Sequence, residues 1–160
     1  MALISCGAKV VSKPSKLPIG YIEIRIFVHA TEETEKVLSA VHRILPEEIG
    51  EELVFKSTSL SGHHGNSIIL LTAKLENRQL LPSALQYIGS KLTSLDKETL
   101  NKDLKLHLEK GNLFLRFNKQ QAFLGKIRFS ANDPIHVKVH FKNRTTEEIF
   151  RMCKEFGLIL

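Results

Sequence analysis

Cysteines and long apolar segments are scarce in this chain. Only two of its 160 residues are cysteine, Cys6 and Cys153, and they lie too far apart for a CxxC redox pair or for the spacing of zinc ligands. We therefore expect reduced thiols in a cytoplasmic protein. No apolar run is long enough to span a membrane. Lysines follow the mildly apolar segment 1–8 instead of preceding it, which is not the order found in a signal peptide.

Common catalytic motifs are missing as well. The chain has no Walker-type phosphate loop and no GxSxG nucleophile elbow. No pair of acids with a partner base suggests general acid–base chemistry. We expect no cofactor and no bound metal. Internal repeats and low-complexity tracts are missing too, and the length suits one domain. The sequence predicts a basic, flexible arm over 1–20 and a single domain over 21–160.

Acidic residues are almost missing from one segment. Between Lys110 and Arg144 only Asp133 is acidic and eight residues are basic, so this segment carries +7 while the whole chain carries +6. A local surplus of positive charge attracts polyanions, of which nucleic acid is the commonest. The alternative is a solvated face whose lysines serve only solubility.

The same segment alternates apolar and polar residues over 112–118, 126–130 and 135–142, the period of strands with one buried face. If these strands share a sheet, its wet face is cationic, with Phe114 placed to stack on a base. The residues expected to contact phosphates there are Arg116, Lys126, Arg128 and Lys138.

The remaining pattern predicts an α+β protein. Further strands are expected over 21–29, 52–60, 67–75 and 104–109. Helices are expected from a cap at Thr31 to Pro46, over 78–93, over 97–103 with Asp96 as cap, and from Thr145 or Thr146 onward. Strands that pair mostly with their sequence neighbours, and helices gathered on one face, give a mostly antiparallel sheet in an α+β fold.

The most unusual loop is Gly-His-His-Gly-Asn at 62–66. Its two glycines allow positive φ, and His63, His64 and Asn66 could donate hydrogen bonds to bases or sugar hydroxyls. A structural loop, a metal site and a histidine pair that cleaves RNA without metal are the alternatives. Adjacent histidines on an extended chain point to opposite sides, which suits a shared metal poorly.

A second motif follows the strand that ends near Phe117. Gly125 is expected to end a helical turn over 119–124, with Phe123 and Leu124 in the core. The residues then left for contacts are Arg116, Lys119 and Gln120.

Together, segments 28–37, 62–66 and 116–125 resemble the small archaeal proteins described as predicted RNA-binding, exosome-associated subunits. The resemblance covers about residues 20–144. It implies the α+β fold of the large-subunit ribosomal protein that holds the small, separate 5S ribosomal RNA. It also implies RNA as ligand, exosome or ribosome components as partners, and no established activity or cofactor. The chain differs from the family at Ser67, where the family has proline, and at Asn118, where it favours an acid that could orient Lys119.

The leading hypothesis is therefore a non-catalytic RNA-binding protein with no membrane partner. Two alternatives stay open. One is a ribonuclease or phosphoesterase that uses His29, His63 or His64. The other is an assembly subunit that docks on an RNA-processing machine through the glutamates at 32–35 or through an exposed sheet edge.

Overall fold

The computed structural model describes residues 19–160. Most of the basic arm predicted over 1–20 lies outside the described residues. Its last two residues belong to a strand, because β2 begins at Ile19 and this side chain is buried against the core.

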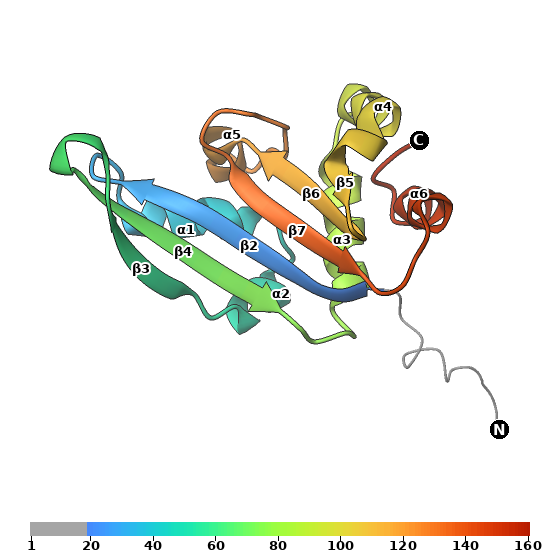
Figure 1. The fold of residues 1–160 in the computed structure, drawn as a ribbon, viewed down its shortest axis with the longest axis horizontal. Helices are drawn as coiled ribbons and strands as arrows, with labels where there is room; N and C mark the ends of the chain where they lie inside the picture. Colours follow the sequence, from blue (N-terminus) through green and yellow to red (C-terminus); the bar gives the residue numbers. More distant parts are fainter. Residues whose placement is uncertain (1–18) are drawn as a thin grey trace.

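Six strands form one antiparallel sheet in the order β3-β4-β2-β7-β6-β5 (Figure 1). The strands are β2 (Ile19–His29), β3 (Lys56–Ser61), β4 (Ser67–Leu75), β5 (Leu108–Glu109), β6 (Asn112–Phe117) and β7 (Ile135–Phe141). The long strands β2 and β7 lie at the centre, so segments from both ends of the domain pair directly.

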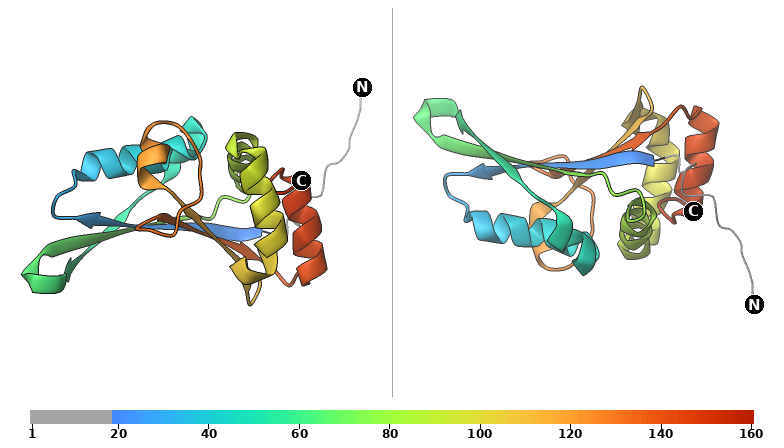
Figure 2. Two further views of the ribbon diagram at one scale, coloured as in Figure 1. Left: turned by 90° about the horizontal axis from the view of Figure 1, so that it is seen from above. Right: turned by 90° about the horizontal axis from the view of Figure 1, so that it is seen from below.

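Within residues 19–160, six helices pack against this sheet, most of them on one face. They are α1 (Thr34–Arg43), α2 (Glu47–Glu52), α3 (Leu81–Lys91), α4 (Ser94–Asp103), α5 (Lys119–Phe123) and α6 (Thr146–Glu155), with 3-10 turns η3 (His63–Gly65) and η4 (Leu104–His107). Figure 2 shows α1, α2, α3 and α5 on the same side of the strands, and α4 and α6 beyond the β5 edge. The predicted α+β class is confirmed. None of the helices in the described part of the chain has the length and apolarity of a membrane span.

The core lies between the sheet and these helices, and alternation along the strands determines which residues enter it. Every second residue of β2, β7 and β6 is at most 3% exposed. These residues are Ile22, Ile24, Ile26 and Val28, then Ile135, Val137, Val139 and Phe141, then Leu113, Leu115 and Phe117. Because successive strand residues point to opposite faces, the residues between them lie on the uncovered side.

The first helix starts later than predicted. Thr31 does not cap it: α1 begins at Thr34 with Glu33 as the N-cap residue. Instead, the backbone N–H of Glu32 donates to the carbonyl of His29, which closes a turn at the end of β2. Pro46 does not merely end this helix, since it is also the N-cap of α2, a short helix that the sequence did not predict.

Residues 126–130 do not form the predicted strand. Only an isolated bridge between Phe117 and Phe129 is present, with Asn118 N–H donating to Arg128 O and Ser130 N–H donating to Arg116 O. A turn at Gly125, with φ of 84°, brings the chain back beside the end of β6. The two segments are joined there by this bridge and these two hydrogen bonds, too few for a strand. The expected strand 104–109 is likewise mostly the turn η4, with two residues left for β5.

Local turn and cap signals were predicted better. The Lys110–Gly111 pair has φ of 52° and 80°, as a tight hairpin between β5 and β6 requires. Thr145 begins α6 with a full capping box to Glu148. Asp96 does not cap α4, because Thr93 is the N-cap residue and its hydroxyl accepts from the Asp96 N–H.

We expect Gly89→Ala in α3 to destabilise the fold. A Cβ at this position would lie 2.5 Å from the carbonyl oxygen of Phe156, and backbone cannot move aside as a flexible side chain can. The end of α6 must then separate from α3, at a cost of about 1–3 kcal/mol in the free energy of unfolding. Chemical denaturation measures this loss. The control is Ser90→Ala, the next and exposed position, and equal losses in both variants would contradict the close packing of these helices.

Candidate nucleic-acid interface

The face of the sheet opposite the helices is here called the open face. Figure 1 looks onto it, with α1, α2 and α3 behind the strands. Strand pairing and alternation assign its residues. They are Lys56, Thr58 and Leu60 of β3; Ile68, Leu70, Thr72 and Lys74 of β4; Tyr21, Glu23, Arg25, Phe27 and His29 of β2; His136, Lys138 and His140 of β7; Asn112, Phe114 and Arg116 of β6; and Glu109 of β5.

The open face is positively charged. Five of these residues are lysine or arginine and two are glutamate, a net charge of +3 with the histidines neutral. Within residues 19–160, no carboxylate lies within ion-pair distance of Arg25, Arg116 or Lys138. These three cations, on three neighbouring strands, are therefore available for an anionic ligand.

Tyr21 holds a group of cations at one end of this face. The Lys74 ammonium lies 4.2 Å from the centre of the Tyr21 ring and the Lys138 ammonium 5.6 Å from it. The ring of His140 stacks on Tyr21 with centres 4.9 Å apart, and a 2.8 Å hydrogen bond joins His140 Nδ1 to Asn112 Oδ1. Cation–π contacts hold the ammonium groups without neutralising them.

Three of the predicted site residues meet on the open face. Phe114 and Arg116 project from β6, and Lys138 of β7 pairs directly opposite Phe114. This is the arrangement that the alternation predicted. The sequence interpretation did not assign a role to Tyr21, Arg25 or Lys74, although the alternation over 21–29 was visible.

Lys119 occupies a different environment from the one predicted. Its side chain is only 9% exposed, and its ammonium donates to Phe27 O at 2.6 Å, Asp133 Oδ2 at 2.8 Å and Glu32 Oε1 at 3.1 Å. An ammonium has three N–H donors, so its hydrogen-bonding capacity is used. Lys119 is therefore a buried counter-ion of Glu32 and Asp133, and its contact with RNA stays a prediction.

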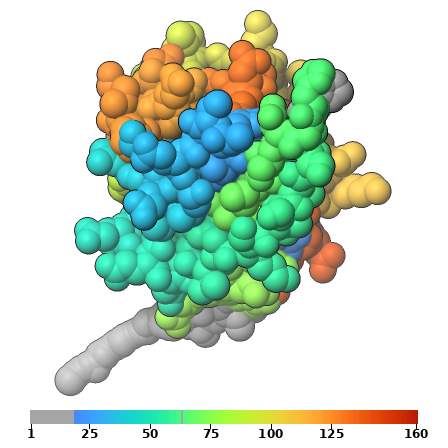
Figure 3. Space-filling view, turned by 90° about the vertical axis from the view of Figure 1, so that its left-hand side faces the viewer, coloured from blue at the N-terminus to red at the C-terminus, as the bar shows by residue number. Residues whose placement is uncertain are grey.

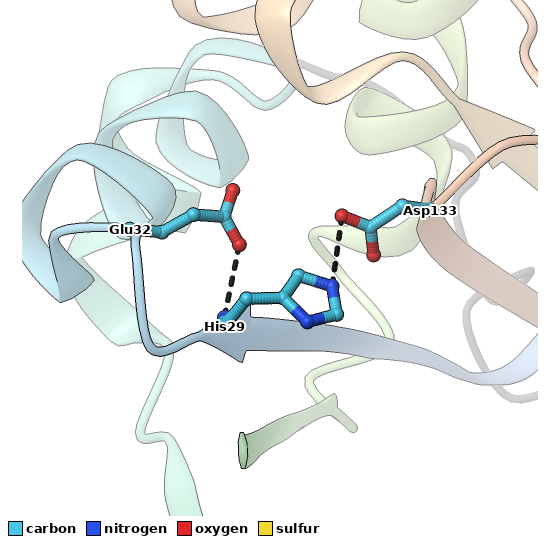
Figure 4. A group of neighbouring side chains, drawn as sticks. All are labelled: His29, Glu32 and Asp133. Atoms are coloured by element: carbon cyan, nitrogen blue, oxygen red, sulfur yellow. Dashed lines mark hydrogen bonds and ion pairs between the residues drawn. The ribbon is translucent and has the colours of Figure 1, made fainter. Parts of the chain in front are cut away.

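His29 completes the group of side chains around the buried Lys119, here called the Lys119 cluster (Lys119, His29, Glu32 and Asp133). His29 Nε2 lies 3.1 Å from Asp133 Oδ2, and the His29 backbone N–H donates to Glu32 Oε1 at 3.0 Å (Figure 4). Burial raises the pKa of the Asp133 carboxyl, but hydrogen bonds from Lys119 and His29 outweigh it, and the net pKa lies below 3.8. The cluster joins the end of β2, the start of α5 and the loop before β7.

The same cluster resembles a metal site in composition. Among the described residues, ligand atoms of His29, Glu32 and Asp133 lie within 4.8 Å of one another. However, the Lys119 ammonium bonds both carboxylates and supplies positive charge where a cation would bind. The donor set thus suits an internal ion pair better than a divalent metal.

The histidine–glycine loop 62–66 forms the tip of the β3–β4 hairpin. Figure 3 faces this end of the molecule and shows the hairpin in green at its border. His64 adopts a positive φ of 61°, and Gly62 N–H donates to Asn66 O. His64 and Asn66 are exposed, and His63 opens the turn η3. The loop extends from the sheet next to the end of β2, outside the strands of the open face.

The other predicted residues are also off the open face. Arg128 Nε lies 3.0 Å from Asp96 Oδ2 on α4, and the Asp96 side chain is 13% exposed. The Asp96 carboxylate therefore neutralises the Arg128 guanidinium. Lys126 is exposed in the loop after α5, and Gln120 is exposed on α5. Phe123 and Leu124 are not in the core: they are 38% and 64% exposed, because the short α5 turns only Ala122 and the Lys119 stem inward.

A sheet covered by helices on one side and cationic on the other is a feature of α+β proteins that bind nucleic acid on a sheet surface. Comparison with known families agrees with this class. Residues 21–141 match the family described as RNA binding, and the chain belongs to that family.

Two archaeal relatives are similar over most of their length. An RNA-binding protein of Pyrococcus abyssi is 34% identical over 130 residues, which cover 79% of this chain and 84% of that protein. An uncharacterized protein of Methanocaldococcus jannaschii is 32% identical over 138 residues, covering 84% and 92%.

Solved structures share the fold. A DUF54 protein from Methanothermobacter thermautotrophicus aligns with a TM-score of 0.67 and 26% identity over 89% of this chain and 98% of that one. A DUF54 protein from Sulfolobus solfataricus aligns with a TM-score of 0.70 and 22% identity, covering 86% and 96%. The expected likeness to a ribosomal protein stays a prediction.

Replacing the buried ammonium in Lys119→Met should destabilise the protein. Glu32 and Asp133 would lose their shared cation, and we expect a loss of about 2–4 kcal/mol, below the range for fully buried pairs because Asp133 is partly exposed. Chemical denaturation at pH 7 measures it. Gln120→Met, at the neighbouring exposed position, is the matched control and should change stability little.

The lowered pKa of Asp133 predicts the pH at which this stabilisation disappears. A carboxyl that binds its proton less readily in the folded state stabilises the fold above its ordinary pKa of 3.8, and the contribution is lost as pH falls through the lower folded pKa. Lys119→Met should therefore weaken the dependence of stability on pH below about 4. An unchanged acid dependence would show that the cluster is not a working ion pair.

Proposed function

We propose that this protein binds single-stranded RNA along its open face and catalyses no reaction on it. The observation that supports this most directly is the set of three cations, Arg25, Arg116 and Lys138, which have no carboxylate partner within residues 19–160 and share the open face with Phe114. Membership of the RNA-binding family and the RNA-binding description of the Pyrococcus abyssi relative agree with it.

Arginine and lysine divide the contacts with RNA by their chemistry. The planar guanidinium groups of Arg25 and Arg116 can each donate two parallel hydrogen bonds to one phosphate. Lys74 and Lys138, held near Tyr21, add point charges along the backbone. Four such contacts give an attraction that depends strongly on salt and little on sequence.

The aromatic rings favour single strands. Phe114 and Phe27 are half-buried on the open face and stack on no other ring of the described residues, so an unpaired base can stack on them. Bases inside a duplex are already stacked, and a duplex is recognised mainly by shape and by its backbone. Loop 62–66, Gln120 and Lys126 stay predicted contacts beside this face.

Two other functions are less well supported. A nuclease that uses His29 would need its ring as an acid or base. The Nε2 atom of this ring is already paired with Asp133, whose carboxylate also binds Lys119. A partner protein that docked on the acidic start of α1 would find two of the three glutamates already paired. Glu32 binds Lys119, and Glu33 pairs with Lys36. Association with exosome or ribosome components would, in this proposal, occur through bound RNA.

The proposal predicts a steep dependence of affinity on salt. With four phosphates neutralised, log affinity should fall against log salt with a slope of roughly −3 for a single strand. Fluorescence anisotropy with a labelled, unstructured RNA measures it. Arg116→Ala and Lys138→Ala should each weaken binding and reduce the slope by about 0.7. Lys154→Ala, an exposed lysine on α6, is the charge-matched control. A slope near zero, or no binding at low salt, would exclude RNA binding by this face.

Stacking predicts a second, independent effect. Phe114→Ala should weaken binding of single strands by about 1–3 kcal/mol and change binding of a duplex of equal length much less. Phe123→Ala, which removes an exposed ring on α5, is the control and should alter neither. Equal losses for single strands and duplexes in Phe114→Ala would show that this ring does not stack on bases.

A further inference from the structure

Three side chains that can each carry positive charge lie in a row across the open face. Strand pairing places Arg25 of β2 directly opposite His136 of β7, and His136 directly opposite Arg116 of β6. Neighbouring strands lie about 4.8 Å apart, so these groups are close. Like charges directly opposite each other destabilise a sheet unless an anion compensates them. A protonated His136 would therefore be repelled from both sides unless an anion bound between the two arginines.

The row lines a small cleft. Its other polar or aromatic lining residues are Glu23, Phe114 and Lys138. Glu23 lies two residues before Arg25 on β2, and its partners in the strand register are Lys74 of β4 and Lys138 of β7. A concave site with two guanidinium groups and an imidazole suits a small, doubly hydrogen-bonding anion such as a phosphate group.

Among the described residues, acidic groups offset the positive charge around His136 only in part. This histidine faces Arg25 from β2 and Arg116 from β6, with Lys138 next on its own face of β7. From the loop before β7 the nearest acid is Asp133, but its carboxylate is bonded by Lys119 and His29. Burial lowers the pKa of His136, Arg25 and Arg116 lower it further, and Asp133 opposes them only in part. In the free protein, His136 is therefore neutral near pH 7.

We propose that Arg25, His136 and Arg116 form a binding site for one phosphate group of RNA, and that His136 takes up a proton when the phosphate binds. The source of the phosphate rests on the proposed function, whereas the chemistry needs only the anion. A bound anion favours the charged imidazolium and offsets the repulsion from both arginines. RNA binding by the open face is thereby linked to pH.

The direction of this linkage follows from the proton uptake. If binding adds a proton to His136, affinity must rise as pH falls through the pKa of the complex, and it levels off below the pKa of the free protein. A rise of one unit in the pKa on binding corresponds to about a tenfold gain in affinity at low pH. We therefore expect roughly three- to tenfold tighter binding at pH 5.5 than at pH 7.5.

The test combines RNA affinity with NMR. Oligouridylate is the RNA probe, because its bases do not titrate between pH 5.5 and 7.5. The wild type should show the expected gain at low pH, and His136→Gln should lose the gain while still binding RNA. Arg25→Gln should weaken binding at both pH values. His42→Gln, an exposed histidine on α1, should behave as wild type. In parallel, titration of the His136 ring protons should give a higher pKa with inorganic phosphate than without it.

The outcomes separate this site from RNA binding itself. Salt-dependent RNA binding that is independent of pH, with a His136 pKa unmoved by phosphate, would overturn the site and leave the proposed function standing. No RNA binding at either pH, together with a His136 pKa raised by phosphate, would overturn the proposed function and keep the anion site. A gain at low pH that persists in His136→Gln would also overturn the site.

Discussion

The packing of helices against only one face of the sheet determines the rest of this structure. Burial of every second residue of β2, β7 and β6 drives that packing, and isoleucine, valine, leucine and phenylalanine fill the layer between sheet and helices. The residues between them must therefore point to the opposite face of the sheet. The register that buries Ile24, Val137 and Leu115 therefore also aligns Arg25, His136 and Arg116 on the open face. A slip of one residue would exchange the two sets.

The protein treats its cations differently in its two environments. Within the described residues, the buried Lys119 has two carboxylates and a backbone carbonyl, and Arg128 has Asp96. On the open face, Lys74 lies 4.0 Å from Glu76, whereas Arg25, Arg116 and Lys138 have no carboxylate of residues 19–160 within ion-pair distance. A buried charge without a partner destabilises the fold, whereas a solvated cation at the surface is stabilised by water and can still bind an external anion. The contrast distinguishes cations that stabilise the fold from cations that remain for a ligand.

Sequence reasoning predicted what local rules determine. Alternation placed Phe114, Arg116 and Lys138 on one face, and the turn at Lys110–Gly111 and the cap at Thr145 followed from their residue types. It failed where partners are distant in sequence. Nothing local indicates that Lys119 meets Glu32, 87 residues away, or that Arg128 meets Asp96. Periodicity does not encode strand order, so the contact between Lys74 of β4 and Tyr21 of β2 could not be predicted from the sequence either.

The most direct test of RNA recognition by the open face is chemical-shift mapping of the labelled protein during titration with oligouridylate. Perturbations should concentrate on alternate residues of β2, β4, β6 and β7, above all Tyr21, Arg25, Phe114 and Lys138, with little change in the helices behind the sheet. Perturbations that instead gather between α1 and α5, around the exposed Phe123 and Leu124, would contradict it.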